Sequence, residues 1–166
     1  MKIEYRTGDL LEAPEPAIVH GCNAQGVMGS GVAKAIRAKY PAAYEAYAQR
    51  HKASGLPLGD TIWVDCERHV VINAITQDRY GRDGKRYADY DAIERAFRNI
   101  DKVARLTQNY EGDRKAPPKV IDAVGMPLIG AGLAGGSWAK ISAIIEDCAE
   151  HFQPVVYLID GKMPTS

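Results

Sequence analysis

The chain has 166 residues, of which 46% are apolar and 25% are charged, and these values are typical of one globular domain with a buried core. Its 21 basic and 21 acidic residues cancel, which removes the electrostatic case for a dedicated nucleic-acid-binding protein. No apolar run is long enough for a transmembrane helix, and the charged first residues do not form a signal peptide. Three cysteines without CxxC spacing indicate reduced thiols, so we expect a cytoplasmic protein with no bound metal or cofactor.

Hydrophobic periodicity predicts strands and helices in alternation along the first third of the chain. Residues 3–7 alternate apolar and polar side chains, which is the pattern of a half-buried strand. Residues 17–20 are apolar enough for a buried strand, and a helix is expected to begin around Val32 after a glycine-rich segment. Pro41 ends or restarts this helix, and the helical pattern stops near Gly55.

The alternation continues in the middle of the chain. Residues 58–65 and 68–75 predict two strands with a tight connection between them. The polar, glycine-rich residues 76–86 predict a loop. A helix with an apolar stripe of 3.6-residue period follows, and Asp89 is placed to cap its first turn.

The last third predicts two more strands and one more helix. A charged loop at 109–118 precedes a buried strand at 119–124. Ser137 can cap a helix, and the last strand is expected at 155–159. Strands alternating with helices favour an α/β layered domain with a mostly parallel or mixed sheet, which we expect to span residues 1–166 as a single domain.

Two glycine-rich segments each lie between a predicted strand and a predicted helix. The first holds Gly21, Gly26, Gly29 and Gly31, and the second runs over residues 130–136. Glycines let the backbone approach a ligand closely, and the first amides of a helix have no partners inside it. The first segment contains no lysine or arginine, so backbone donors and the helix dipole would hold a phosphate. A cleft between two such loops suits a diphosphate better than a single phosphate.

Two common nucleotide-binding patterns are excluded by spacing. The dinucleotide-binding pattern GxGxxG requires a spacing that Gly26, Gly29 and Gly31 do not have. The acidic residue that this pattern requires after the next strand is also missing. The string GxxxxGK[ST] of a P-loop does not occur.

Three stretches, read in order, make the chain resemble the macrodomain family, which binds ADP-ribose. They are Gly8-Asp9-Leu10, Asn23-Ala24-Gln25-Gly26-Val27-Met28-Gly29-Ser30-Gly31-Val32-Ala33 and Pro127-Leu128-Ile129-Gly130-Ala131-Gly132-Leu133-Ala134-Gly135. In that family the first stretch carries the aspartate that accepts from the adenine amino group, and the other two are the ligand-binding loops. The resemblance covers about residues 2–159 and implies a three-layer α/β/α sandwich with a mixed, largely parallel central sheet.

The resemblance also implies where a ligand would lie, namely ADP-ribose or a phosphorylated ADP-ribose derivative. Adenine would lie near Asp9 and Leu10, and the distal ribose near His20 and Asn23. The diphosphate would lie across the two loops, whose implied binding residues are Gly26, Val27, Met28, Gly29, Ser30, Gly31, Val32, Gly130, Ala131, Gly132, Leu133, Ala134 and Gly135.

The start of the first loop narrows the resemblance to one branch of the family. His20-Gly21-Cys22-Asn23 stands where NAAN is commoner, and this resembles the branch of ADP-ribose 1''-phosphate phosphatases and of glycohydrolases that remove terminal or DNA-linked ADP-ribose. Ala134 stands where those glycohydrolases of terminal ADP-ribose carry an aspartate, and Tyr87 falls near their lysine. Both departures count against a lysine–aspartate covalent mechanism. Most other macrodomains place an aromatic residue at the Ala134 position, so its absence implies a more open distal end.

Three functions follow from the resemblance, and the sequence leaves all three open. The first is a hydrolase that dephosphorylates ADP-ribose 1''-phosphate to ADP-ribose. The second is an ADP-ribosyl glycohydrolase acting on modified protein or nucleic acid, which would need a lysine or carboxylate such as Lys85 or Asp89 near the ribose. The third is a module that binds ADP-ribose without turnover. No membrane partner is expected, and we expect a monomer.

Several candidate residues also have a purely structural interpretation. His20, whose ordinary pKa near 6.5 suits proton transfer, is either catalytic or a partly buried histidine bonded to backbone. Asn23 either holds a ribose hydroxyl or bonds its own loop, and Asp9 either binds adenine or shapes a turn. Residues 78–86 carry four basic side chains, which either cover the distal end and neutralise a phosphate or form a solvated loop.

Overall fold

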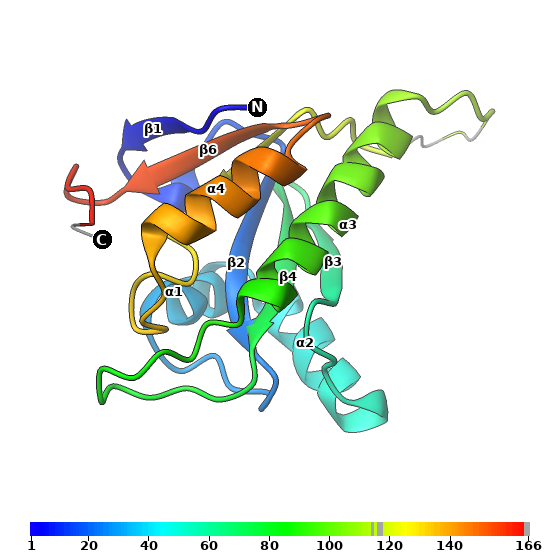
Figure 1. Cartoon of the computed structure of the whole chain (residues 1–166). Helices are drawn as coiled ribbons and strands as arrows, with labels where there is room; N and C mark the ends of the chain where they lie inside the picture. The colour runs from blue at the N-terminus through cyan, green and yellow to red at the C-terminus, as the bar shows by residue number, and fades with distance from the viewer. Residues whose placement is uncertain (114, 116–117, 165–166) are drawn as a thin grey trace.

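The computed structural model, which describes residues 1–113, 115 and 118–164, is built on one six-stranded sheet (Figure 1). The sheet order is β1-β6-β5-β2-β4-β3, and every neighbouring pair is parallel except β3 with β4. The strands are β1 (Glu4–Thr7), β2 (Ala17–Asn23), β3 (Thr61–Cys66), β4 (His69–Gln77), β5 (Ala123–Met126) and β6 (Gln153–Leu158). Part of the predicted loop at 109–118 and the last two residues lie outside the described residues.

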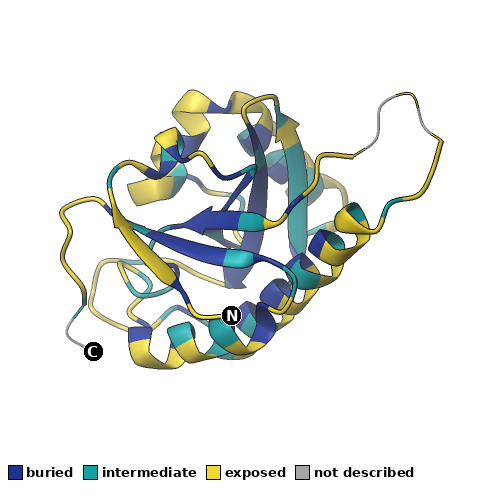
Figure 2. Cartoon of the chain, turned by 90° about the horizontal axis from the view of Figure 1, so that it is seen from above, coloured by how far each residue is buried: buried dark blue, intermediate teal, exposed yellow. Residues whose placement is uncertain are grey.

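Helices cover both faces of the sheet. They are α1 (Gly31–Lys39), α2 (Pro41–Ser54), α3 (Tyr90–Gln108) and α4 (Trp138–Cys148), with a short 3-10 turn η1 (Leu10–Glu12) after β1. Helices α1 and α2 lie on one face, and α3 and α4 lie on the other (Figures 1 and 2). The expected three-layer α/β/α sandwich with a mixed, largely parallel sheet is therefore confirmed.

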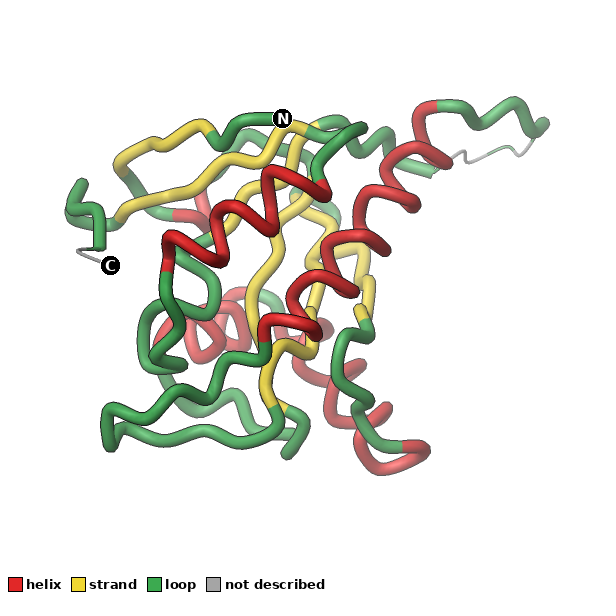
Figure 3. The backbone as a smooth tube through the Cα atoms, in the orientation of Figure 1, coloured by secondary structure: helices red, strands yellow, loops and turns green. Residues whose placement is uncertain are grey.

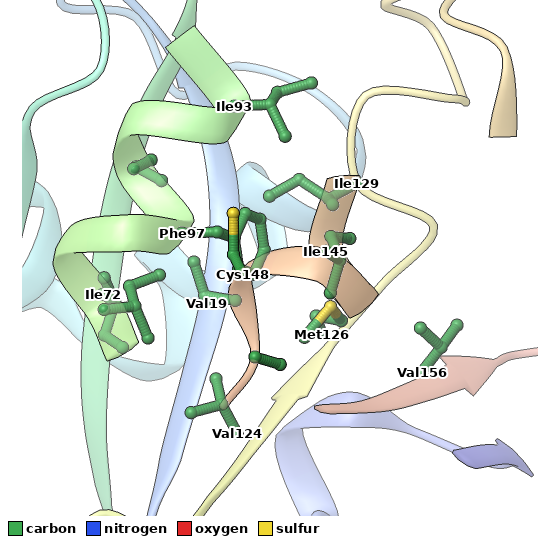
Figure 4. Packing of buried hydrophobic residues seen from close by; sticks show 14 of the residues in the cluster. Val19, Ile72, Ile93, Phe97, Val124, Met126, Ile129, Ile145, Cys148 and Val156 are labelled. Atoms are coloured by element: carbon green, nitrogen blue, oxygen red, sulfur yellow. The ribbon is translucent and has the colours of Figure 1, made fainter. Parts of the chain in front are cut away.

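The larger apolar core lies between the sheet and the α3/α4 layer. Val19, Phe97 and Ile145 are fully buried there, and Figure 4 shows them converging from β2, α3 and α4. The ring of Phe97 stacks on that of Phe152, with centroids 6.5 Å apart. The opposite face has two smaller clusters, one of them around Ile36 of α1.

The helix boundaries follow the sequence closely. Pro41 restarts the helical segment as predicted, because it is the first residue of α2. The Asp89 carboxylate accepts the amide of Ala92 and caps α3, and the Ser137 hydroxyl accepts the amide of Lys140 and caps α4. Both predicted caps are thus confirmed.

Several strand predictions are wrong in burial or extent. The first strand is exposed along its whole length because β1 is an edge strand, and the buried Ile3 precedes it. Of the strand expected at 119–124, only 123–124 belong to β5, which continues to Met126. The last strand ends at Leu158, one residue earlier than predicted, and Ile159 is 84% exposed.

Two central strands run further than predicted. Strand β2 continues beyond His20 to Asn23, and β4 continues through Thr76 to Gln77. The polar residues that looked like loop are held in the sheet because β2 and β4 pair in parallel along their whole length, with His20 beside Asn73 and Asn23 beside Gln77. His20 is therefore in the middle of a strand and not at its end. Within the described part of the chain, no helix is long and apolar enough to cross a membrane.

Candidate active site

Three loops meet at the edge where β2, β4 and β5 end. These strands are neighbours and parallel, so their carboxyl ends point the same way, and the loops that follow them lie together (Figure 3). We call residues 24–30 the first loop, residues 78–88 the strap and residues 127–137 the second loop. Together with the start of α1 they line a cavity of about 690 Å³.

The beginning of α1 faces this cavity with its amides unused. Ser30 is the N-cap residue, but its side chain makes no cap hydrogen bond. Among the described residues, the amides of Gly31, Val32 and Ala33 have no acceptor, and these residues line the cavity. Unpaired first-turn amides and the positive end of the helix dipole form an anion site.

The second loop offers a matching set of donors. Gly130, Gly132, Leu133 and Ala134 line the cavity, and their amides have no acceptor in the part of the chain that the structure describes. The loop keeps its shape through other bonds, such as that from the Gly136 amide to the Gly130 carbonyl at 2.8 Å. Backbone amides that protein does not satisfy need water or a ligand.

The strap bridges the two loops. At its start, the Ala24 amide donates to the carbonyls of Gln77 and Asp78 at 2.9 and 3.1 Å. At its end, the amides of Tyr87 and Ala88 both donate to the Ala134 carbonyl, at 2.7 and 3.0 Å. The residues of the strap that line the cavity are Tyr80, Gly81 and Arg82. The loop for which the sequence leaves open a covering or a merely solvated role thus contributes to the cavity wall.

His20 lines the cavity from the sheet and is 1% exposed. Its Nε2 lies 2.6 Å from Oδ1 of Asn73, whose Nδ2 donates to the Ala43 carbonyl at 3.1 Å. This orientation of the amide leaves an acceptor facing the ring, so Nε2 carries the proton and Nδ1 is the basic nitrogen. Burial lowers the pKa of His20 to about 4, so the sequence-based expectation of a pKa near 6.5 is wrong and the ring is neutral at pH 7.

Both the oxygen and the nitrogen of the Asn23 side-chain amide make hydrogen bonds that hold the first loop in shape. Its Oδ1 accepts from the amides of Gln25 and Val27 and from the Tyr47 hydroxyl, and its Nδ2 donates to the Val27 carbonyl at 2.8 Å. The buried hydroxyl of Tyr47 also donates to the Asn23 carbonyl at 2.5 Å. A direct bond from Asn23 to a ribose hydroxyl stays a prediction.

Asp9 caps η1 through Oδ1, which accepts the Leu11 amide at 2.9 Å. Its other oxygen has no hydrogen bond within the described residues, and the side chain is exposed. Leu10 is buried and packs against Gly125 beneath the turn. The adenine role of both residues stays a prediction.

The structure brings most of the predicted site residues together around one cavity. Those that line it are His20, Val27, Gly29, Ser30, Gly31, Val32, Gly130, Gly132, Leu133 and Ala134. Those that do not line it are Asp9, Leu10, Asn23, Gly26, Met28, Ala131 and Gly135. Met28 is 1% exposed and belongs to the core, and the His51 ring packs where a side chain at Gly26 would lie.

Other lining residues are absent from the sequence-based set. Besides Tyr80, Gly81 and Arg82 of the strap, they are Gly21, Ala33, Gln77, Pro127, Leu128 and Ile129. Gly21 is required by packing, because a Cβ there would lie 2.7 Å from Oγ1 of Thr76 and 3.2 Å from Ile129. Only the pairing of β2 with β4 brings Gln77 to the cavity, and no local pattern indicates it.

A metal has no evident place in this cavity. The described residues contain one trio with suitable spacing, Asp101, Glu150 and His151, which does not line the cavity. The Asp101 carboxylate already accepts from the amides of Glu150 and His151 and binds the His151 ring at 2.8 Å.

Comparison with known proteins agrees with this geometry. The model of the Macro domain family matches residues 19–145. An ADP-ribose 1''-phosphate phosphatase of Neosartorya fischeri is 51% identical, over 88% of this chain and 90% of that protein.

A second group of relatives carries another name. A DNA ADP-ribosyl glycohydrolase of Mycobacterium tuberculosis is 29% identical over 84% of this chain, which corresponds to only 36% of that longer protein. The solved macrodomain of Mycobacterium tuberculosis DarG superposes with a TM-score of 0.76 and 24% identity, covering 93% of this chain and 96% of that one. This last likeness concerns the fold.

Proposed function

Since the chain belongs to the macrodomain family, we propose that it binds ADP-ribose in the cavity and removes the phosphate of ADP-ribose 1''-phosphate. The observation that carries this proposal is the double row of free amides at the start of α1 and along the second loop. Two rows of backbone donors suit a diphosphate, which has two phosphate groups to bind. The relatives named as phosphatases, two of them 51% identical, support the choice of reaction.

In this proposal the free amides hold the diphosphate, and the rest of the ligand extends from it. The diphosphate lies between Gly29–Val32 and Gly130–Gly135, and the adenine amino group donates to the free oxygen of Asp9. The distal ribose then lies near His20, over the first loop that Asn23 shapes. The exposed apolar side chains of Val32 and Leu133 flank the cavity and can pack on sugar or base.

The reaction needs positioning and charge stabilisation more than a strong acid or base. A water molecule attacks phosphorus, the bond from phosphorus to the anomeric oxygen breaks, and a proton passes from the water to that oxygen. Backbone amides stabilise the charge on the phosphoryl oxygens. Neutral His20 accepts the water's hydrogen bond at Nδ1, because Nε2 is committed to Asn73.

A glycohydrolase is the alternative, because some relatives carry that name. It is less well supported by the cavity, since no lysine, aspartate or glutamate is among the described lining residues. Lys85 lies 3.9 Å from Asp83 with its side chain 79% exposed, and Asp89 caps α3. A non-catalytic binding module remains the third reading.

The proposal is tested by calorimetric titration with ADP-ribose and by phosphate release from ADP-ribose 1''-phosphate in the same preparation. We expect saturable binding and release that falls at least about tenfold in His20→Ala. If the protein binds ADP-ribose but releases no product from any substrate, the non-catalytic binding module is the function that remains. Release of ADP-ribose from modified DNA or protein, with no phosphate release, would select the glycohydrolase, and absence of binding would reject the site.

The setting of the protein is also part of the proposal. We propose that residues 1–166 act as a single monomeric domain in the cytoplasm, where free thiols persist. Cys22, Cys66 and Cys148 are free in the structure. Size-exclusion chromatography with light scattering tests the monomer.

A further inference from the structure

The cavity has one formally charged residue among the described residues that line it. This residue is Arg82 of the strap, while His20 is neutral and the remaining lining residues are uncharged. An anion that enters the cavity therefore meets one guanidinium and otherwise backbone amides.

The Arg82 side chain also has no partner in the described part of the chain. It makes no hydrogen bond or ion pair with any described residue, although Asp83 is its neighbour in sequence. The Asp83 carboxylate is occupied by the Tyr87 hydroxyl at 2.8 and 2.9 Å and by the Lys85 amide at 3.2 Å. Because the carboxylate next to it is already bonded, the guanidinium of Arg82 is available to a ligand.

The other basic residues of the strap have partners or lie elsewhere. Arg79 lies 3.8 Å from Asp78, and Lys85 lies 3.9 Å from Asp83. The guanidinium of Arg86 lies over the ring of Tyr90, 4.7 Å from its centroid. None of these three basic residues lines the cavity.

The strap holds Arg82 near the far end of the second loop. Gly81 packs closely on the Tyr87 ring, and a side chain at Gly81 would clash with the Tyr87 hydroxyl. The Tyr87 amide in turn donates to the Ala134 carbonyl at 2.7 Å. The neighbour of Arg82 in the chain, Gly81, is thus packed on a residue that is bonded to Ala134 of the second loop.

We propose that Arg82 is the specificity-determining residue that selects a ligand with a phosphate on the distal ribose over ADP-ribose itself. This inference rests on the proposed function, which places the distal ribose near His20, in the same cavity that Arg82 lines. The diphosphate is held by the amides of α1 and the second loop, so it does not need the guanidinium. Among the described residues that line the cavity, Arg82 is the one cation available to a further phosphate dianion, and a guanidinium fork matches its oxygens.

The test compares Arg82→Gln with Arg79→Gln, which removes the same charge from the same strap outside the cavity. We measure KM for ADP-ribose 1''-phosphate by phosphate release, and Kd for ADP-ribose by calorimetry. Arg82→Gln is expected to raise KM by about tenfold or more while changing Kd less than about threefold. Arg79→Gln is expected to change neither constant, and Arg82→Lys to recover part of the selectivity because it restores charge without the fork.

The outcomes separate this inference from the proposed function. If Arg82→Gln weakens the binding of both ligands equally, the guanidinium acts at the diphosphate and the inference is overturned. The inference is also overturned if Arg82→Gln changes neither KM nor Kd. If the wild-type protein releases no phosphate, the phosphatase proposal fails, and the unconsumed ADP-ribose 1''-phosphate is titrated directly by calorimetry. A selective loss of its affinity in Arg82→Gln would then still support the role of Arg82, and its absence would reject it.

Discussion

The two faces of the sheet are built on different plans. On the α3/α4 face the core is apolar, and both helices begin with a side-chain cap, Asp89 for α3 and Ser137 for α4. On the α1/α2 face, α1 begins without a side-chain cap, and polar side chains such as His20 and Asn73 are buried. The two helices of the α3/α4 face therefore have closed starts, while the start of α1 leaves amides unpaired where a ligand would bind.

The buried polar groups of the α1/α2 face are not defects, because they have partners. His69 lies 2.6 Å from the Tyr40 hydroxyl and 2.7 Å from the Ala13 carbonyl, and His20 is bonded to Asn73. Such pairs hold the strands and α2 in register at a modest cost in hydrophobic burial. The free amides of α1 differ from these pairs, since within the described residues nothing satisfies them.

The largest effect is expected in the apolar core. Phe152→Ala should lower the free energy of unfolding by about 3–5 kcal/mol, because it leaves a cavity beside Phe97. The affinity of the folded protein for ADP-ribose should change by less than about twofold, since Phe152 precedes β6 at the other end of the strands. Urea denaturation and calorimetry measure the two quantities.

Ile36→Ala on α1 is the matched change on the other face. It should lower the free energy of unfolding by about 2–5 kcal/mol. It should also weaken ADP-ribose binding, because the packing of α1 positions its first amides. Equal effects of Phe152→Ala and Ile36→Ala on affinity would break the comparison between the faces.

Acid should destabilise the protein through the α1/α2 face. Since the pKa of His20 is about 4 when folded and about 6.5 when unfolded, the unfolded chain binds the proton more tightly. Its contribution to stability is complete above about pH 6.5 and is lost as pH falls towards 4, by about 3 kcal/mol at most. Burial also lowers the pKa of His69, which acts in the same direction.

Urea denaturation at a series of pH values checks this. The free energy of unfolding should depend less steeply on pH between pH 6.5 and 4.5 in His20→Gln than in the wild type. The glutamine does not titrate, and its amide can still donate to Asn73. Ile145→Val on the α3/α4 face should shift the curve by about 1 kcal/mol at every pH without changing its slope. A slope that is the same in His20→Gln and in the wild type would contradict the assignment.

The open start of α1 can be filled by an acidic cap. Ser30→Asp should stabilise the helix by about 0.5–1 kcal/mol, because Ser30 makes no cap bond and the carboxylate of aspartate complements the helix dipole. It should weaken ADP-ribose binding by at least about tenfold, because the carboxylate repels the diphosphate. Calorimetry and thermal denaturation measure both effects.

Ser137→Asp is the control for that experiment. It keeps a capping group on α4 and lies outside the cavity lining, so the affinity for ADP-ribose should be unchanged. Unchanged affinity in Ser30→Asp would mean that the start of α1 does not face the anion.

The smallest effects come from removing hydroxyls. Ser137→Ala should cost about 1 kcal/mol, since it deletes the bond to the Lys140 amide. Ser30→Ala should change stability by less than about 0.5 kcal/mol, because Ser30 makes no cap bond. If urea denaturation shows the same loss of unfolding free energy in Ser137→Ala and Ser30→Ala, the two helix starts do not differ in their capping.

Sequence reasoning succeeded where the pattern is local. The caps Asp89 and Ser137, the restart at Pro41 and the two glycine loops depend on residues within one turn of each other. The β3–β4 hairpin was likewise predicted from two short runs and a tight connection. These features follow from the conformational preferences of a few neighbouring residues.

It failed where burial depends on distant partners. The exposure of β1 reflects its place at the sheet edge, and the extension of β2 to Asn23 reflects pairing with β4. The expected pKa of His20 was wrong because the desolvation of its ring comes from the α1/α2 layer that packs over it. The free guanidinium of Arg82 depends on Tyr87 occupying Asp83, which no local pattern indicates.

The layered α/β class, the helix starts and the two glycine loops follow from the sequence, because they depend on periodicity and on short-range backbone preferences. Which amides stay unpaired, which histidine nitrogen carries the proton and which of the strap's basic residues faces the cavity are set by the folded arrangement. These properties depend largely on contacts between segments that are distant in the chain, such as the bond from His20 to Asn73 with its sequence separation of 53. Desolvation and partner geometry act through space, so the folded arrangement sets them.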